Sequence, residues 1–361
     1  MTTENTKSSQ HNLLAAFEAG EARALARAIS WVENARPGFE QLLSSLHDRV
    51  GPAQRIGITG PPGAGKSTLI HALARLVRAE RGERVGVVAV DPTSPFTGGA
   101  LLGDRIRMTG AAGDDGVFIR SMASRGSMGG LATTTREVAD LMDAFGFERV
   151  VVETVGVGQS ELEIAEAADT TVVVLTPESG DSIQAMKAGL MEIADIFVVN
   201  KADRPEATRA AGELKTILRL RQGQVYDRVP AHHGVDLTEM AKRGAKKDEG
   251  RAQAAEEPSG WEIPVLLTTG HSGDGVPELL ETLDAHFEWL QATGGLQERR
   301  RKRLLERVRA VVDRGLKNKV WKEGEGPAIL EAAREDLETG RRSPYDVAGE
   351  ILRHIGAGAE E

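Results

Sequence analysis

The chain has 361 residues, no cysteine and a formal net charge of −9. Its hydrophobic fraction of 40% and charged fraction of 27% are typical of a globular protein, and its length allows one large α/β domain with helical additions. The acidic balance disfavours binding to nucleic acid or to an anionic membrane. The lack of cysteine excludes disulfides and thiolate metal sites and favours a cytoplasmic location, and we expect neither a signal peptide nor a membrane span.

Residues 1–50 are expected to form an N-terminal helical extension. Residues 1–10 are polar, and we expect them to be disordered. From Leu13 to Val50 apolar side chains recur at helical spacing, and Pro37 separates two helices. This pattern is distinct from the strand and helix alternation that follows it.

Residues Gly60 to Ser67 read Gly-Pro-Pro-Gly-Ala-Gly-Lys-Ser and fit the phosphate-binding loop of nucleotide hydrolases. A strand pattern precedes this P-loop and a helix pattern follows it, which is the order that the mechanism requires and which disfavours a chance glycine-rich turn. Lys66 is expected to reach the β- and γ-phosphates, and the Ser67 hydroxyl to bind Mg²⁺. The candidate nucleotide contacts in this stretch are Gly60, Pro62, Gly63, Ala64, Gly65, Lys66, Ser67 and Thr68.

Residues 51–293 alternate short apolar runs with helix patterns. The runs are rich in β-branched residues and nearly continuous, as in parallel strands that helices cover on both faces. Strands are predicted at residues 56–58, 85–90, 150–152, 171–175, 196–199 and 261–269. Helices are predicted at residues 131–145, 160–168, 182–193, 204–220 and 276–290, and residues 244–260 are expected to form an exposed insertion. The sequence therefore predicts the doubly wound, mostly parallel α/β sheet of P-loop NTPases, with ligand chemistry at the carboxyl ends of the strands.

The tetrapeptide Asn200-Lys201-Ala202-Asp203 follows the predicted strand at 196–199 and has the form of the guanine-reading motif of GTPases. The Asp203 carboxylate can accept hydrogen bonds from N1–H and the amino group of guanine, whereas adenine would leave it unpaired. Asn200 is expected to brace the loop, and the Lys201 stem to lie over the base. Thr269 is a further candidate contact, and GTP is favoured over ATP.

Glu153-Thr154-Val155-Gly156 follows the predicted strand at 150–152, where most GTPases have Asp-x-x-Gly. The acid is expected to hold Mg²⁺, and Gly156 to sense the γ-phosphate as the hinge of a switch. Asp91 and Asp104 are acids near the P-loop that either join the Mg²⁺ shell or cap helices. The predicted Mg²⁺ ligands are Ser67, Asp91, Asp104 and Glu153.

Hydrolysis also needs a group that orients water, and no glutamine directly follows Gly156. Gln159 lies three residues further and is the candidate for that role. A slow intrinsic rate that a partner raises is therefore expected. The candidate catalytic residues are Lys66, Asp104, Glu153 and Gln159.

Residues 294–361 differ in composition from the preceding domain. A run of arginines and lysines accompanies an apolar stripe from Leu304 to Leu316, which predicts a long amphipathic helix. Two shorter helices are predicted at residues 328–337 and 346–355. This segment is either a helical dimerisation arm or a helix with a solvated basic face.

Several motifs together resemble the MeaB/methylmalonic aciduria type A family, which includes ArgK-like proteins. They are residues 91–100, 102–108, 153–161 and 199–203. Members of this family are P-loop GTPases that act as chaperones of adenosylcobalamin-dependent acyl-CoA mutases. The resemblance implies GTP hydrolysis with Mg²⁺, a mutase of the methylmalonyl-CoA type as partner, and coupling of hydrolysis to cofactor loading and protection.

The resemblance also implies an extra switch loop, which matches residues 177–187 here. Asp181 and Lys187 are its expected charged contacts to the nucleotide or the partner, although a helix cap and a solvated lysine are the alternatives. Two other functions are weighed against the chaperone: nickel delivery to hydrogenase or urease, and an ATP-dependent kinase of amino-acid transport. The absence of cysteine disfavours the first, and the motif at Asn200–Asp203 disfavours the second.

Overall fold

The computed structural model describes residues 3–91, 114, 116–123, 133–154, 160–179, 188–221 and 260–357. Contacts within the chain divide it into two compact units, Met1–Gln297 and Glu298–Glu361, which are described in turn. No described helix is both long enough and apolar enough to cross a membrane.

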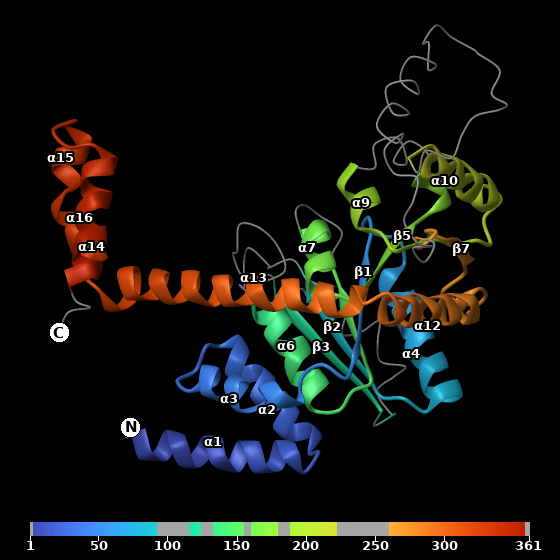
Figure 1. Ribbon diagram of the computed structural model, residues 1–361, viewed down its shortest axis with the longest axis horizontal. Coiled ribbons are helices and arrows are strands. Elements are labelled where there is room, and N and C mark those ends of the chain that lie inside the picture. Colours follow the sequence, from blue (N-terminus) through green and yellow to red (C-terminus); the bar gives the residue numbers. More distant parts are fainter. Residues whose placement is uncertain are drawn as a thin grey trace, which may run out of the picture. The chain divides into compact units, whose positions relative to one another are not determined.

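A seven-stranded sheet with the order β3-β2-β4-β1-β5-β6-β7 forms the centre of the first unit (Figure 1), and every neighbouring pair is parallel. The strands are β1 (Gln54–Thr59), β2 (Val85–Asp91), β3 (Val117–Ala123), β4 (Arg149–Glu153), β5 (Thr170–Leu175), β6 (Ile196–Asn200) and β7 (Val265–Thr268). The chain places β2 to β4 on one side of β1 and β5 to β7 on the other, so its direction of winding reverses at β1. Ligands bind at the carboxyl ends of strands beside such a reversal, and the P-loop follows β1.

Helices cover both faces of this sheet, which confirms the predicted fold class. One face packs against α4 (Lys66–Arg81) and α12 (Val276–Ala292), through side chains such as Ile58 and Val172. The opposite face packs against α6, α7, α9 and α10. Their bounds are Thr133–Ala144, Ser160–Ala167, Ala188–Ile193 and Ala207–Arg221.

Sequence patterns placed six of the seven strands, and β3 was missed. Its residues Val117-Phe-Ile-Arg-Ser-Met-Ala mix apolar and polar types because β3 lies at an edge of the sheet. Arg120 in this strand forms an ion pair with Glu33 and donates a hydrogen bond to Ser30 Oγ at 3.2 Å. Both partners lie in the N-terminal helix α2 (Ala22–Glu33). The predicted insertion at 244–260 lies outside the described residues, except for Gly260.

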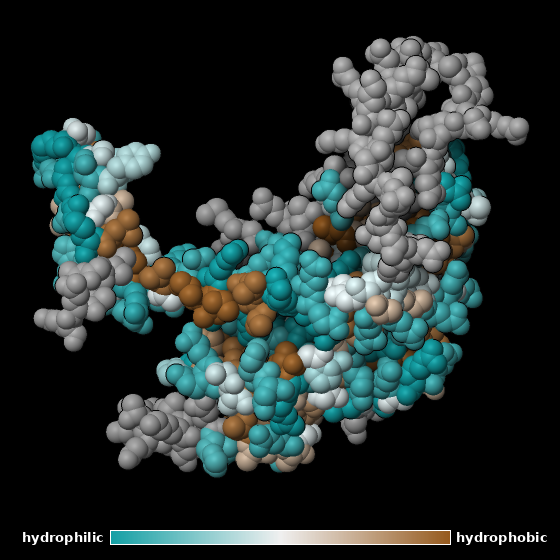
Figure 2. Space-filling model, viewed as in Figure 1, coloured by the Kyte–Doolittle hydropathy of each residue, from teal (hydrophilic) through white to brown (hydrophobic). Residues whose placement is uncertain are grey.

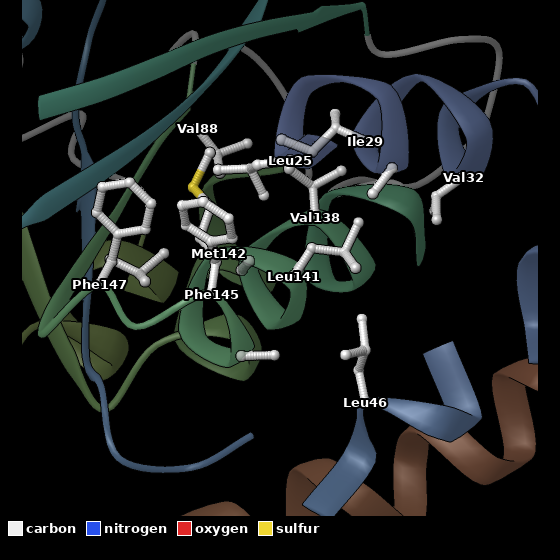
Figure 3. Packing of buried hydrophobic residues seen from close by; sticks show 14 of the residues in the cluster. Leu25, Ile29, Val32, Leu46, Val88, Val138, Leu141, Met142, Phe145 and Phe147 are labelled. Atoms are coloured by element: carbon white, nitrogen blue, oxygen red, sulfur yellow. The ribbon is translucent and has the colours of Figure 1, made fainter. Parts of the chain in front are cut away.

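Of three N-terminal helices, α2 packs against α6, and α1 and α3 contribute side chains to the same buried cluster. The three helices are α1 (Thr3–Glu18), α2 (Ala22–Glu33) and α3 (Phe39–Ser45). Figure 3 shows Leu25 and Ile29 of α2 beside Val138 and Leu141 of α6, within one buried cluster. Because α1 begins at Thr3, the expectation of disorder is wrong for residues 3–10.

A buried arginine fixes the start of β1 against α6. Arg55 Nη2 lies 2.7 Å from Asp140 Oδ1 and 2.8 Å from Asp143 Oδ2. Asp143 also accepts hydrogen bonds from the backbone N–H of Gly51 and Ala53, at 3.0 and 3.1 Å. Burying these charges is tolerated because the carboxylates receive several hydrogen bonds as well as the arginine charge.

The second unit is helical and has a small core. It contains most of α13 (Gly295–Asn318), then a π-helical turn (Lys319–Glu323), α14 (Gly326–Ala332), α15 (Arg334–Glu338) and α16 (Pro344–Ala357). Its buried cluster consists of Ala333, Val347 and Ile351. The apolar stripe of α13 remains exposed, and Figure 2 shows it as a band of hydrophobic side chains; its residues are Leu304, Leu305, Val308, Val311, Val312 and Leu316.

Candidate nucleotide-binding site

The P-loop joins β1 to α4 as the sequence predicts. Thr59 ends β1, and Lys66 is the first residue of α4. Gly65 caps this helix with a left-handed backbone (φ 84°), and a Cβ there would lie 2.5 Å from Asn200 Nδ2. Gly60 has a φ of 135°, and its Cβ would lie 2.0 Å from the carbonyl oxygen of Val174. Both positions therefore require glycine for conformation and for space.

The Lys66 side chain lies within the loop that it is expected to serve. Lys66 is only 6% exposed, and its Nζ donates hydrogen bonds to the carbonyl oxygens of Gly60 at 2.8 Å and Pro61 at 3.1 Å. These carbonyls keep a buried ammonium group hydrogen-bonded. The positive charge is thus held at the loop where phosphates bind in proteins of this type.

Ser67 and Glu153 meet across the carboxyl edge of the sheet. The Ser67 hydroxyl donates to Glu153 Oε1 at 2.8 Å, and Glu153 ends β4 with 5% exposure. A hydroxyl and a carboxylate oxygen are the hard donors that Mg²⁺ takes from protein, the rest of its shell being water and phosphate oxygens. The pair therefore fits a nucleotide-bound Mg²⁺, and the described residues hold no cluster of three His, Asp or Glu side chains that would bind a metal by itself.

Asn200 connects the P-loop to the loop after β7. Its Nδ2 donates to the carbonyl oxygen of Ala64 at 2.8 Å. Its Oδ1 accepts from Thr268 Oγ1 at 3.1 Å and from the backbone N–H of Gly270 at 3.0 Å. Asn200 is 2% exposed, so these bonds form in a buried environment. The Asn200 side chain thus connects two loops that are distant from it in sequence, the P-loop and the loop after β7.

Lys201 and Asp203 follow Asn200 at the surface. Lys201 has a φ of 60°, which is uncommon for a residue other than glycine and occurs at functional turns. Asp203 is exposed, as a carboxylate that reads a ligand base must be before binding. The backbone N–H of Ala202 donates to the Thr268 carbonyl oxygen at 2.9 Å, so this turn and β7 are held together.

The loop after β7 contains Thr269, a predicted nucleotide contact, and Gly270, which the sequence patterns did not single out. Thr269 is half-buried, and its N–H donates to the Asp274 carbonyl oxygen at 2.9 Å. Gly270 bonds to Asn200, and a Cβ at Gly270 would lie 3.1 Å from the backbone nitrogen of Leu69. The one sequence signal for this close approach is Gly270 itself, because a glycine allows two backbone segments to pack closely.

A histidine on the P-loop helix adds no positive charge at neutral pH. His71 lies one turn beyond Ser67 on α4, and burial lowers its pKa, with a further lowering from Arg75. The positive charge within the loop itself is therefore that of Lys66.

Several predicted site residues lie outside the part of the chain that the structure describes. They are Asp104, Gly156, Gln159, Asp181 and Lys187. Asp91 ends β2, at the carboxyl edge as expected, but its side chain is also outside the described part. Glu178 of the predicted switch loop is described, and it forms an exposed ion pair with Arg204, the residue after Asp203.

A P-loop on a parallel sheet, an acid at the end of the neighbouring strand and an Asn-Lys-x-Asp turn linked to that loop define a P-loop GTPase. The sequence model of the family described as Methylmalonyl Co-A mutase-associated GTPase MeaB matches residues 25–325. The chain belongs to this MeaB family, which confirms the resemblance and the activity of GTP hydrolysis.

Known proteins agree with this assignment. A relative in Pyrococcus abyssi is 42% identical over 350 residues, which cover 96% of this chain and 97% of that protein. GTPase ArgK of Escherichia coli is 34% identical over 306 residues, which cover 84% of this chain and 83% of ArgK. A crystal structure titled LAO/AO transport system kinase superposes with a TM-score of 0.63 at 24% identity, covering 97% of this chain and 98% of that one, and supports the fold.

Proposed function

We propose that this GTPase is a chaperone of an adenosylcobalamin-dependent acyl-CoA mutase of the methylmalonyl-CoA mutase type, and that it couples GTP binding and hydrolysis to cofactor loading and protection. The observation that carries the proposal is the match of residues 25–325 to a family described as associated with methylmalonyl-CoA mutase. The alternatives, a nickel-delivery GTPase and a kinase of amino-acid transport, become outcomes of the test below.

The residues of the site divide the work of hydrolysis. Lys66 binds the β- and γ-phosphates, and the P-loop backbone surrounds them. Asp203 accepts the hydrogen bonds of guanine, while Asn200 keeps the base-reading turn and the P-loop in register. Gln159 is the candidate for orienting water, and a slow intrinsic rate that the mutase raises follows from its unusual distance from Gly156.

Magnesium belongs to this proposal as the cofactor. Ser67 and Glu153 would hold the ion, with Asp91 and Asp104 as further candidates. When bound, Mg²⁺ neutralises charge on the phosphate oxygens. Asp181 and Lys187 of the switch loop are proposed to carry the nucleotide state to the partner.

A homodimer through residues 294–361 is the second part of the proposal. Six apolar side chains of α13 are each between 37% and 56% exposed, and such a stripe is buried in an assembled helical interface. Leu305→Glu is expected to convert dimer to monomer in light scattering, whereas Lys317→Glu should leave the dimer intact, because no residue of the stripe lies three or four positions from this exposed lysine. A wild-type chain that is monomeric at micromolar concentration would refute this part.

The absence of cysteine supports the proposed cytoplasmic location.

The chaperone role is tested by co-purification with an acyl-CoA mutase from the same cells. We expect the mutase to be retained with a non-hydrolysable GTP analogue and released with GDP, and we expect it to accelerate GTP turnover. A chain that retains no mutase with any nucleotide and binds stoichiometric nickel would instead be a nickel-delivery GTPase. Turnover of ATP with phosphate transfer to a protein or amino acid would indicate the kinase.

A further inference from the structure

Two threonine hydroxyls join the carboxyl ends of β1 and β4. Thr154 Oγ1 donates to Thr59 Oγ1 at 2.8 Å, and the two residues are 1% and 0% exposed. The parallel ladder pairs Ile58 with Glu153, and the N–H of Thr154 donates to the Ile58 carbonyl oxygen at 3.1 Å. This hydroxyl pair, Thr59 and Thr154, therefore extends the β1–β4 pairing by one residue beyond the end of β4.

Each member of the hydroxyl pair is bonded in sequence to a residue of the nucleotide site. Thr59 precedes Gly60 of the P-loop, and Thr154 follows Glu153. Side chains alternate between the faces of a strand. Glu153 lies on the face of α4, where it bonds to Ser67, so Thr154 lies on the opposite face. The hydroxyl pair thus attaches the end of β4 to β1 on one face of the sheet, while Glu153 contacts the P-loop helix α4 on the other face.

We propose that Thr59 and Thr154 are positioning residues that hold the Glu153 carboxylate against Ser67 and so set how strongly Mg²⁺ retains the nucleotide. This inference rests on the magnesium role proposed above for Ser67 and Glu153. Valine at position 154 keeps the shape of threonine and removes the hydroxyl, leaving Thr59 with an unpaired buried oxygen. The end of β4 then loses this side-chain bond to β1, and we expect the Glu153 carboxylate to be held less firmly against Ser67.

The experiment measures release of a fluorescent GDP as a function of Mg²⁺ concentration, which reports on the site without relying on turnover. T154V and T59V should each raise the Mg²⁺ concentration for half-maximal retention by about 3- to 10-fold, the factor that corresponds to one hydrogen bond. T154S, which restores the hydroxyl, should return close to wild type. T170V is the matched control, because Thr170 is also fully buried and its hydroxyl bonds to His286 Nδ1 at 2.9 Å, at the amino end of β5. T170V should lower the Tm without shifting the Mg²⁺ dependence.

The double variant T59V/T154V separates positioning from stability. Removing both hydroxyls leaves no unpaired partner, so the Tm should recover toward wild type while the Mg²⁺ shift persists. The inference would be overturned if the double variant recovered both the Tm and the Mg²⁺ dependence of the wild type. It would also be overturned by a wild-type Mg²⁺ dependence in T154V, or by an equal shift in T170V.

Glu153→Gln distinguishes failure of the positioning role from failure of the magnesium assignment. If Glu153→Gln leaves the Mg²⁺ dependence unchanged, the assignment itself is wrong; if it shifts the dependence and T154V does not, only the positioning role is wrong.

Discussion

Polar side chains are buried both where the strands of the sheet end (the carboxyl edge) and where they begin (the amino edge), but the two groups of side chains have different partners. At the carboxyl edge, Asn200 and Glu153 bond to the P-loop and to the helix that follows it. At the amino edge, Arg149 Nε lies 2.5 Å from Glu83 Oε2, and Arg149 Nη2 lies 2.7 Å from Asp284 Oδ1. Arg55 forms an ion pair with Asp143 at the same edge. The carboxyl-edge bonds connect loops that must respond to a ligand, whereas the amino-edge bonds connect strands to helices and loops of the scaffold. Substitutions at the first edge should therefore change nucleotide chemistry, and those at the second only stability.

Lys66→Ala should give the largest effect. It removes the cation of the P-loop, and we expect kcat for GTP to fall by about 100-fold or more, the scale of losing a charged transition-state contact. Because the hydrogen bonds from Lys66 to the Gly60 and Pro61 carbonyls lie within its own loop, we expect the Tm to change little. Turnover and thermal unfolding check this, and a large fall in Tm with normal turnover per folded molecule would contradict it.

Asn200→Ala tests whether the carboxyl-edge bonds also hold the fold. It leaves the Ala64 carbonyl and the Gly270 N–H without this partner, and we expect a loss of about 2–4 kcal/mol in unfolding free energy together with weaker GTP binding. Asn34→Ala is the control, because Asn34 Nδ2 also donates to a backbone carbonyl, at 2.7 Å to Ser30, but at an exposed site. It should cost about 0.5 kcal/mol or less. Equal costs in denaturant titrations of the two variants would mean that the buried bridge has no special role.

Arg149→Met tests the amino edge. Burial lowers the pKa of Arg149, but hydrogen bonds to Glu83 and Asp284 raise it by more, so the guanidinium stays charged. We expect a loss of about 2–3 kcal/mol in unfolding free energy, at the low end for a buried pair because Glu83 and Asp284 are 31% and 25% exposed. GTP turnover per folded molecule should be unchanged. An altered KM for GTP would show that the two edges are coupled.

Arg204→Ala should have the smallest effect. In its ion pair with Glu178, the Arg204 side chain is 44% exposed and the Glu178 side chain 49% exposed. Exposed ion pairs contribute about 0–1 kcal/mol to the free energy of unfolding. We expect nearly wild-type stability and KM for GTP. A clear change in KM would assign this pair to the nucleotide site despite its exposure.

Sequence patterns predicted the parts of the site that lie close together along the chain. The P-loop, the acid at Glu153 and the turn at Asn200–Asp203 each lie at the carboxyl end of a strand that a short apolar run predicted. Pairings across the sheet could not be predicted, because the bond from Thr154 to Thr59 depends on strand register. Strand β3 was missed because its polar residues satisfy contacts to α2 and not the pattern of a central strand.

The most direct test of the central claim, that the carboxyl edge is a guanine-nucleotide site, is the affinity of Asp203→Asn for GTP and for xanthosine triphosphate. The amide can no longer accept both hydrogen bonds of guanine, but it can donate to the C2 carbonyl of xanthine. We predict that GTP affinity falls by about 100-fold or more and that xanthosine triphosphate restores tight binding, with an unchanged Tm because Asp203 is exposed. An unchanged affinity for GTP, or an equal loss for both nucleotides, would contradict the account.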